Sequence, residues 1–203
     1  MIAVIDYGVG NLFSLCGSLS HLGADVCVTD DPALLLKADR IILPGVGAFG
    51  DAIQKLKDTG LVPCIRECVN RGTPILGICL GMQLLFEKSY EYGEYEGLGL
   101  IPGEIRPLKE QLPPEYKVPH MGWNSLDFKQ DSPLFRYIKE GEYVYYVHSF
   151  YGANCGDSTL ATSSYGGFDV TGAVARGCVY GTQFHPEKSG DTGLRILKAF
   201  LEV

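Results

Sequence analysis

The sequence predicts an α/β fold in which a mostly parallel central sheet is flanked by helices and carries added antiparallel strands. In the first half of the chain, short apolar runs alternate with segments of helical period, the pattern of βα units around a parallel sheet. In the second half, β-like runs follow one another with Gly and Pro between them, as antiparallel strands do. The 203 residues suffice for one well-covered core, so we expect a single domain over residues 1–203.

The expected elements follow from these patterns. Buried strands are expected at residues 2–5, 24–29, 40–43 and 74–78. Apolar residues at helical spacing predict helices over residues 11–22, 48–57 and 61–70. The β-like runs of the second half cover residues 97–108, 116–126, 142–151, 159–164 and 170–184, and a helix is expected over 190–202. The polar segment 109–117, which contains two prolines, is the expected mobile loop.

Charge and hydropathy exclude two classes of function. The 17 Lys and Arg residues are outnumbered by 24 Asp and Glu, and no basic run interrupts the sequence, so a track for nucleic-acid phosphates has no basis. No apolar stretch approaches the roughly 20 residues of a membrane helix. The apolar residues 2–5 are typical of a buried strand rather than of a signal peptide, and we expect a cytoplasmic protein.

The seven cysteines are odd in number and irregularly spaced within apolar segments, which favours reduced thiols over a disulfide framework. Zinc ligands would show as paired cysteines or histidines, but the sequence has no C-x-x-C or H-x-x-x-H pair. We therefore expect neither a metal nor a cofactor.

The strongest motif is Gly77-Ile78-Cys79-Leu80-Gly81, which lies between an apolar strand run and the helical run 82–86. Its spacing is that of a strand–turn–helix elbow, where a nucleophile occupies a strained turn and glycines let the strand and helix approach. The start of the helix would favour the reactive thiolate, and Leu80 would offer a backbone N–H to an oxyanion. The alternative is a buried cysteine between two packing glycines.

A base and an orienting acid are expected near the other end of the chain, in His185-Pro186-Glu187. Pro186 should hold His185 extended, and in an extended segment side chains two apart point to one side, so Glu187 can accept a hydrogen bond from the ring. Cysteine, histidine and carboxylate match a nucleophile, its base and an orienting acid. The other three histidines, His21, His120 and His148, are more simply explained as packing residues.

These motifs, together with the loop Pro44-Gly45-Val46-Gly47, resemble those of the triad-type, or class I, glutamine amidotransferases almost end to end. Within that family, the segments 6–11, 44–49, 119–124, 145–149 and 183–189 are similar to those of the glutaminase subunits of imidazole glycerol phosphate synthases. The resemblance implies a flavodoxin-like α/β fold and hydrolysis of glutamine to glutamate and ammonia. It also implies a heterodimer, because 203 residues leave no room for the (β/α)₈ cyclase that uses the ammonia in histidine biosynthesis.

The resemblance also implies roles for individual residues. An oxyanion hole would combine the N–H of Leu80 with one from Val46-Gly47. Glutamine would be held by Gln83, Glu91 and the main chain of Ser149 and Phe150. The family uses five further positions near the contact with the cyclase, namely Asn11, Met121, Trp123, Tyr145 and Lys188.

Some of these assignments have direct competitors. Gln83 follows Cys79 by four residues, which suits one helix face, although a surface glutamine has the same spacing. Residues 90–96 offer several acids besides Glu91, and an acidic solvated loop explains them nearly as well. Trp123, the only tryptophan, suits a buried core position as well as an interface.

Three other functions remain open from the sequence. The chain could be a glutaminase that serves another synthase, such as one forming anthranilate or carbamoyl phosphate. It could be a cysteine peptidase or γ-glutamyl hydrolase with the same triad. It could also be a non-catalytic binding partner, although the complete set of Cys79, His185 and Glu187 argues against this.

Overall fold

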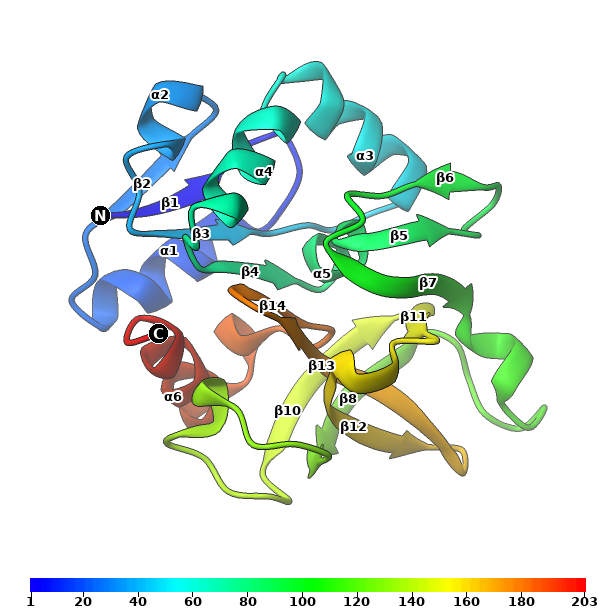
Figure 1. Cartoon of the computed structure of the whole chain (residues 1–203). Coiled ribbons are helices and arrows are strands. Elements are labelled where there is room, and N and C mark those ends of the chain that lie inside the picture. The colour runs from blue at the N-terminus through cyan, green and yellow to red at the C-terminus, as the bar shows by residue number, and fades with distance from the viewer.

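The computed structural model describes residues 1–203 and centres on an eight-stranded sheet with helices on both faces (Figure 1). The strand order is β2-β1-β3-β4-β14-β13-β12-β9, and the first five of these strands are parallel. The parallel strands are β1 (Ile2–Ile5), β2 (Val26–Thr29), β3 (Arg40–Leu43), β4 (Ile75–Ile78) and β14 (Val179–Thr182). The antiparallel strands added beyond them are β13 (Phe168–Arg176), β12 (Thr159–Tyr165) and β9 (Asp127–Phe128).

The helices divide between the two faces of this sheet. One face is covered by α1 (Leu12–His21) and α6 (Gly190–Phe200), the other by α2 (Pro32–Leu35), α3 (Phe49–Asp58) and α4 (Val62–Asn70). The short helix α5 (Leu80–Leu84) follows β4 directly. All five expected helices form, and α2, too short to show a periodic pattern, is an addition.

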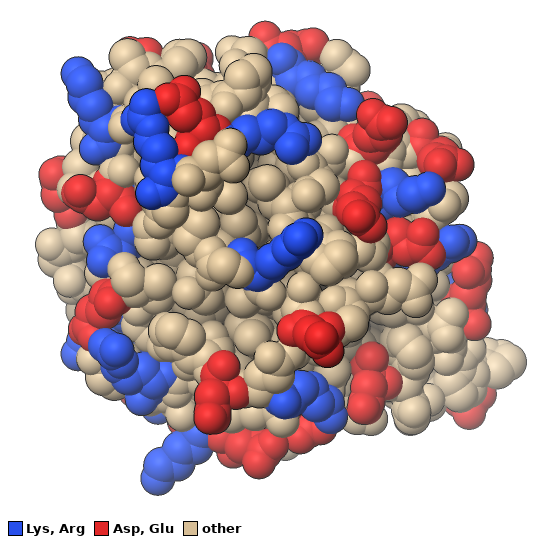
Figure 2. Space-filling model, viewed as in Figure 1, with Lys and Arg blue, Asp and Glu red and all other residues tan.

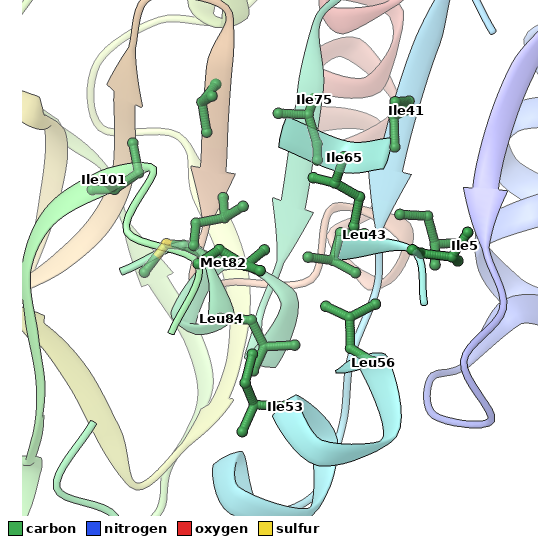
Figure 3. Close-up of a cluster of buried hydrophobic side chains, with 14 of the residues drawn as sticks. Ile5, Ile41, Leu43, Ile53, Leu56, Ile65, Ile75, Met82, Leu84 and Ile101 are labelled. Atoms are coloured by element: carbon green, nitrogen blue, oxygen red, sulfur yellow. The ribbon is translucent and has the colours of Figure 1, made fainter. Parts of the chain in front are cut away.

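The main core lies between the sheet and helices α3 and α4. Strand residues such as Ile5, Leu43 and Ile75 are fully buried and face Leu56 and Ile65 of the two helices (Figure 3). A second core lies on the opposite face, where α1 and α6 pack against the alternate residues of the same strands. Burial on both faces explains why these strands are continuous apolar runs in the sequence.

Several strands that follow α5 build two smaller sheets instead of extending the main one. One has the order β11-β7-β5-β6, and the other pairs β10 with β8. The expected strands at 97–108, 116–126 and 142–151 therefore lie outside the main sheet, and the last of them divides into β10 and β11, one in each small sheet. The strands involved are β5 (Phe86–Ser89), β6 (Tyr95–Glu96), β7 (Ile101–Pro107), β8 (His120–Ser125), β10 (Tyr143–His148) and β11 (Phe150–Ala153).

Turns account for further differences from the expected elements. The run 170–184 is two strands, β13 and β14, because Gly177 with φ 59° turns the chain between them. Residues 82–86 end their helix at Leu84, after which β5 begins. The expected loop 109–117 starts within a 3₁₀ helix. The four 3₁₀ helices are η1 (Leu108–Gln111), η2 (Pro133–Phe135), η3 (Gly156–Ser158) and η4 (Pro186–Lys188).

Charged side chains of both signs are interspersed over the face of the molecule in Figure 2, with no continuous basic track across it. This distribution agrees with the acidic net charge of −7 and with the absence of a basic run in the sequence. None of the helices has both the length and the apolar character required to cross a membrane.

Replacing Phe200 with Ala tests the core under α6. Phe200 is fully buried and lies edge-on to Tyr180, with ring centroids 6.3 Å apart. Deleting its ring leaves a cavity, and we expect the free energy of unfolding to fall by about 3–5 kcal/mol in a denaturant titration. The control is Phe13→Ala, because Phe13 is 91% exposed and its loss should change stability by no more than about 0.5 kcal/mol. Equal effects of the two substitutions would contradict this packing.

Candidate active site

Cys79 occupies a sharp turn between β4 and α5. Its backbone has φ 54° and ψ −111°, a conformation that residues other than glycine rarely adopt. A Cβ added at Gly77 would lie 2.7 Å from backbone atoms of Met82, and one added at Gly81 would lie 1.8 Å from the Leu43 carbonyl oxygen. The glycines on either side of the nucleophile are therefore required by the close approach of β4, α5 and β3, as the elbow motif predicts.

The sheet brings the late motif to this turn. Strands β4 and β14 are parallel neighbours, with Ile78 paired to Thr182. The N–H of Cys79 donates to the Thr182 carbonyl oxygen at 2.7 Å, so the residues that follow β14 lie beside the elbow. The N–H of His185 then donates to the Tyr145 carbonyl oxygen of β10 at 2.9 Å, which anchors the histidine from its other side.

His185 and Glu187 form the expected pair. Nδ1 of His185 lies 2.8 Å from Oε1 of Glu187, and their side chains are only 3% and 4% exposed. His185 is extended, with φ −96° and ψ 100°, as the following proline predicts. Glu187 lies in the 3₁₀ helix η4, however, so the contact arises from this tight turn and not from two residues on one side of a strand. The expected contact is present, and the reason expected for it is wrong.

The environment of His185 favours its protonated form. Burial lowers the pKa of the imidazole, but the interactions of the ring with Cys79 and Glu187 outweigh burial and raise the pKa to about 9. At neutral pH the ring is therefore an imidazolium beside the Cys79 sulfur. Such a pair supplies both a nucleophile and a proton donor.

A cavity of about 310 Å³ opens in front of Cys79 and His185. All seven residues expected at the oxyanion hole and substrate site line it, namely Val46, Gly47, Leu80, Gln83, Glu91, Ser149 and Phe150. Three further lining residues, Pro119, Val147 and His148, were missed by the sequence analysis. They come from β10 and the entry to β8, whose position beside the elbow depends on a fold that local pattern does not determine.

Gln83 is held by its amide nitrogen. Nε2 donates to the Phe150 carbonyl oxygen at 3.1 Å and to Oε1 of Gln183 at 3.0 Å, which uses both of its hydrogens. Oε1 of Gln83 is left to accept a hydrogen bond from a ligand. Gln183 is fully buried, and its own Nε2 lies 3.7 Å from the Cys79 sulfur. Sequence reasoning missed Gln183, although it stands two residues before His185 within the motif segment 183–189.

Glu91 is the acid of the segment 90–96 that lines the cavity. Its Oε2 accepts a hydrogen bond from the Phe49 N–H at the start of α3, at 2.8 Å, and the residue is buried. Burial raises the pKa of this carboxyl, and the hydrogen bond from Phe49 opposes that shift. Glu94 and Glu96 are exposed and lie outside the cavity, so the solvated-loop alternative describes them and not Glu91.

The loop that carries Val46 and Gly47 is held in place by buried contacts with Tyr7 and the elbow helix. The hydroxyl of Tyr7 donates to the Pro44 carbonyl oxygen at 2.7 Å in a buried contact, and burial raises the pKa of this phenol, which keeps it a donor. Gly45 has no room for a side chain, since a Cβ would lie 2.8 Å from the Gly81 N–H nitrogen. The loop therefore packs directly against the elbow helix.

The five expected interface residues lie outside the cavity. Met121 and Trp123 are 61% and 55% exposed, so the core alternative for Trp123 is wrong. Trp123 lies edge-on to half-buried Tyr145, with ring centroids 5.9 Å apart. Lys188, which directly follows Glu187 of the triad in the sequence, is exposed. Asn11 is half-buried and caps α1, accepting from the Ser14 N–H at 3.5 Å.

Comparison with known proteins decides the family. The model of the class-I glutamine amidotransferase family matches residues 3–203. The chain belongs to this family. Curated relatives named imidazole glycerol phosphate synthase subunit HisH align with nearly the whole of this chain. The protein from Bacillus cereus is 51% identical over 200 residues, which are 98% of this chain and 93% of the relative. That from Wolinella succinogenes is 48% identical over 204 residues and all of both chains.

This amidotransferase therefore groups with the glutaminase subunits of imidazole glycerol phosphate synthase, which confirms the resemblance drawn from its motifs. Solved structures confirm the fold. A crystal structure of a glutamine amidotransferase gives a TM-score of 0.76 at 18% identity and covers 100% of this chain and 98% of the other. PurLQS from Thermotoga maritima gives 0.77 at 21% identity, with 99% and 97% covered.

Gly81→Ala tests the elbow of the amidotransferase. The added methyl would overlap the Leu43 carbonyl oxygen, a backbone atom that moves only if β3 moves. We expect glutaminase activity to be lost and stability to fall by about 1–3 kcal/mol or more. The control is Gly17→Ala at an exposed position of α1, where an added Cβ meets nothing within 4 Å. This substitution should stabilise the protein by up to about 1 kcal/mol. Native activity in Gly81→Ala would refute the steric requirement.

Proposed function

We propose that Cys79, His185 and Glu187 hydrolyse glutamine to glutamate and ammonia, and that a separate cyclase subunit consumes the ammonia. The observation that carries the proposal is the convergence of these residues, from opposite ends of the chain, on one cavity. Its volume of about 310 Å³ suits a small amino acid. The grouping with synthase glutaminase subunits supports the same reaction.

Free glutamine is a zwitterion, so its site needs an acceptor for the α-ammonium and donors for the α-carboxylate. Glu91 supplies the negative charge, because one of its oxygens is held by Phe49 and the other remains for the substrate. The carbonyl oxygen of Gln83 accepts a second N–H of the substrate. The main chain at Ser149 and Phe150 forms the wall on which the rest of the glutamine lies.

The reaction begins with the Cys79 thiolate, which attacks the side-chain amide carbon of glutamine. The negative charge that develops on the amide oxygen is stabilised by backbone N–H groups at Leu80 and in the Val46-Gly47 loop; losing one such donor costs roughly 10²–10³ in rate. The imidazolium of His185 passes a proton to the amide nitrogen as the C–N bond breaks. Ammonia leaves, and a γ-glutamyl thioester remains on Cys79.

Water completes the cycle. The now neutral imidazole of His185 removes a proton from the water that attacks the thioester, while Glu187 stabilises the imidazolium that forms. A second oxyanion collapses, the C–S bond breaks, and glutamate leaves with the thiolate–imidazolium pair restored.

The ammonia must reach its acceptor without entering bulk water, where protonation would remove its nucleophilicity. A docked cyclase, a separate (β/α)₈ chain in a heterodimer, meets this need. We assign its contact to the surface of Asn11, Met121, Trp123, Tyr145 and Lys188. Exposed aromatic and thioether side chains such as Trp123 and Met121 are typical anchors of protein interfaces.

Cys79→Ala tests the division of labour between the subunits. We expect the variant complex to form no glutamate from glutamine and to retain cyclase activity with added ammonia, because only the thioester step is removed. Glutamate release and cyclase product are measured on the same preparation. Cleavage of γ-glutamyl peptides by the native enzyme, without turnover of free glutamine, would favour a hydrolase instead. Failure with added ammonia as well would contradict the assignment of Cys79 to the glutaminase step alone.

The raised pKa of His185 predicts a pH dependence. The folded-state pKa of about 9 lies above the ordinary value of about 6.5, so the ring of the folded protein stays protonated through neutral pH and loses its proton as pH rises through about 9. We expect kcat/KM for glutamine to fall across that same range, because the proton donor disappears. In Glu187→Gln, which lacks the stabilising charge, this alkaline limb should move at least about one pH unit lower.

The matched control is Glu115→Gln on the exposed segment between β7 and β8, which should leave the profile unchanged. An alkaline limb that stays in place in Glu187→Gln would show that the carboxylate does not set the ionisation of His185.

A further inference from the structure

A buried pair of histidines lies beside the active site but outside the triad. His120 begins β8 and His148 ends β10, and the two residues are directly paired in the antiparallel ladder. Nδ1 of His120 lies 3.0 Å from Nε2 of His148, and both residues are buried. His148 lines the cavity, whereas His120 lies behind it and does not reach the cavity.

The hydrogen-bond partners fix where each ring carries its proton. Nδ1 of His148 lies 2.7 Å from the Phe150 carbonyl oxygen, which can only accept, so this nitrogen carries the hydrogen. Nε2 of a neutral His148 is then an acceptor, and Nδ1 of His120 must donate to it. Nε2 of His120 lies 3.4 Å from the amide nitrogen of Asn124, which is a donor. The hydrogen bonds therefore all run in one direction, from Asn124 through His120 and His148 to the Phe150 carbonyl oxygen. Burial lowers the pKa of His120 to about 4 and that of His148 to about 3, so both rings are neutral at physiological pH.

The ring of His120 has little freedom to leave this arrangement. It is stacked between Tyr146, at 4.7 Å between ring centroids, and Tyr165, at 4.2 Å. Both tyrosine hydroxyls are themselves held, the first with Ser163 Oγ at 2.8 Å and the second by donation to the Lys117 carbonyl oxygen at 2.8 Å. The donor of His120 is therefore aimed at His148 by rigid neighbours.

The chain ends on the wall of the substrate site. The Phe150 carbonyl oxygen that accepts from His148 also accepts from Nε2 of Gln83, at 3.1 Å. This carbonyl oxygen thus accepts hydrogen bonds from both His148 and the side-chain amide of Gln83, a residue that lines the cavity. Without a donor from His120, the buried Nε2 of His148 would be unsatisfied, and rotation of the ring to find a partner would release the Phe150 carbonyl.

We propose that His120 is a positioning residue for glutamine binding: its Nδ1–H holds the His148 ring, and through it the Phe150 carbonyl and the Gln83 amide, in the arrangement that receives the substrate. The inference rests on the glutamine site proposed above. A core residue that only filled space between two tyrosines could be replaced by any ring of similar size, and this difference can be measured.

Two substitutions separate the roles. His120→Phe keeps an aromatic ring between Tyr146 and Tyr165 but removes the donor. His120→Asn loses the ring but places its amide nitrogen where Nδ1 lies in the native protein. With the cyclase bound, we expect His120→Phe to raise KM for glutamine roughly tenfold, with kcat changed less than about twofold, and His120→Asn to stay within about threefold of the native KM. His21→Phe on exposed α1 is the control and should behave as the native protein.

The outcomes are distinct. A native KM in His120→Phe, or an equal rise in both variants, would overturn the role of the donor. Co-elution of each variant with the cyclase on gel filtration should match that of the native protein, which verifies assembly. If the native complex itself forms no glutamate from glutamine, the proposed function fails; if it does and His120→Phe retains the native KM, only the inference about His120 fails.

A measurement on the native protein decides the matter even if a variant does not fold. Nitrogen NMR of ¹⁵N-imidazole-labelled protein at pH 7.5 reports which ring nitrogen carries hydrogen. We expect His120 and His148 to be neutral and protonated at Nδ1, the opposite of the Nε2–H form that free neutral histidine prefers. An Nε2–H form in either residue, or an imidazolium, would break the chain of donors and overturn the proposal.

Discussion

The close packing of the elbow against the sheet is the constraint on which the active site depends. Cys79 holds a backbone conformation that costs of the order of 1–3 kcal/mol, and it persists only because its neighbours allow no other path. Gly81 touches the end of β3 and Gly45 touches the elbow helix, so the nucleophile, the strand beside it and the oxyanion loop are one packed unit. A side chain at either glycine would push the elbow helix away from β3 or from the oxyanion loop. The contact between these three elements shapes the cavity.

The parallel register of the sheet supplies the other half of the site. Pairing of Ile78 with Thr182 places the residues that follow β4 and β14 at the same carboxyl edge. Cys79 and Gln183 leave the sheet there side by side, although they are 104 residues apart in the chain. Ligand sites in open α/β sheets form at this edge for the same geometric reason. The tight turn of η4 then brings Glu187 back to the His185 ring.

Local sequence pattern predicts the parts of this protein that local forces determine. The four parallel strands of the first half and the helices between them are buried or amphipathic in their own sequence, and the structure has them within two residues of their expected ends. The elbow is predictable because each of its glycines is required by close packing: a side chain at Gly77 would overlap the backbone of Met82, and one at Gly81 would overlap the Leu43 carbonyl oxygen. By contrast, the separate sheets of β5–β8, β10 and β11 depend on which edges pair, and His148 becomes a site residue only through that pairing. Gln183 reaches the nucleophile only through the pairing of β4 with β14. The contact of His185 with Glu187 was found for a wrong reason, because an extended segment and a 3₁₀ turn can both bring two such side chains together.

The two-stranded ribbon of β8 and β10 connects the catalytic groups to the outer surface. Side chains alternate along each strand, so Met121 and Trp123 face outward, while His120 of β8 and Tyr146 and His148 of β10 face the interior. The backbone of the same ribbon reaches the triad, since the Tyr145 carbonyl oxygen accepts from the His185 N–H and the Val147 carbonyl oxygen lies 3.9 Å from the Cys79 sulfur. A second contact reinforces the first, because Ser189 Oγ accepts from the Tyr145 N–H and donates to the His185 carbonyl oxygen. A displacement of this ribbon therefore changes the surroundings of sulfur and imidazole together, and a partner that binds its outer face acts on the same strands that form the wall of the substrate site.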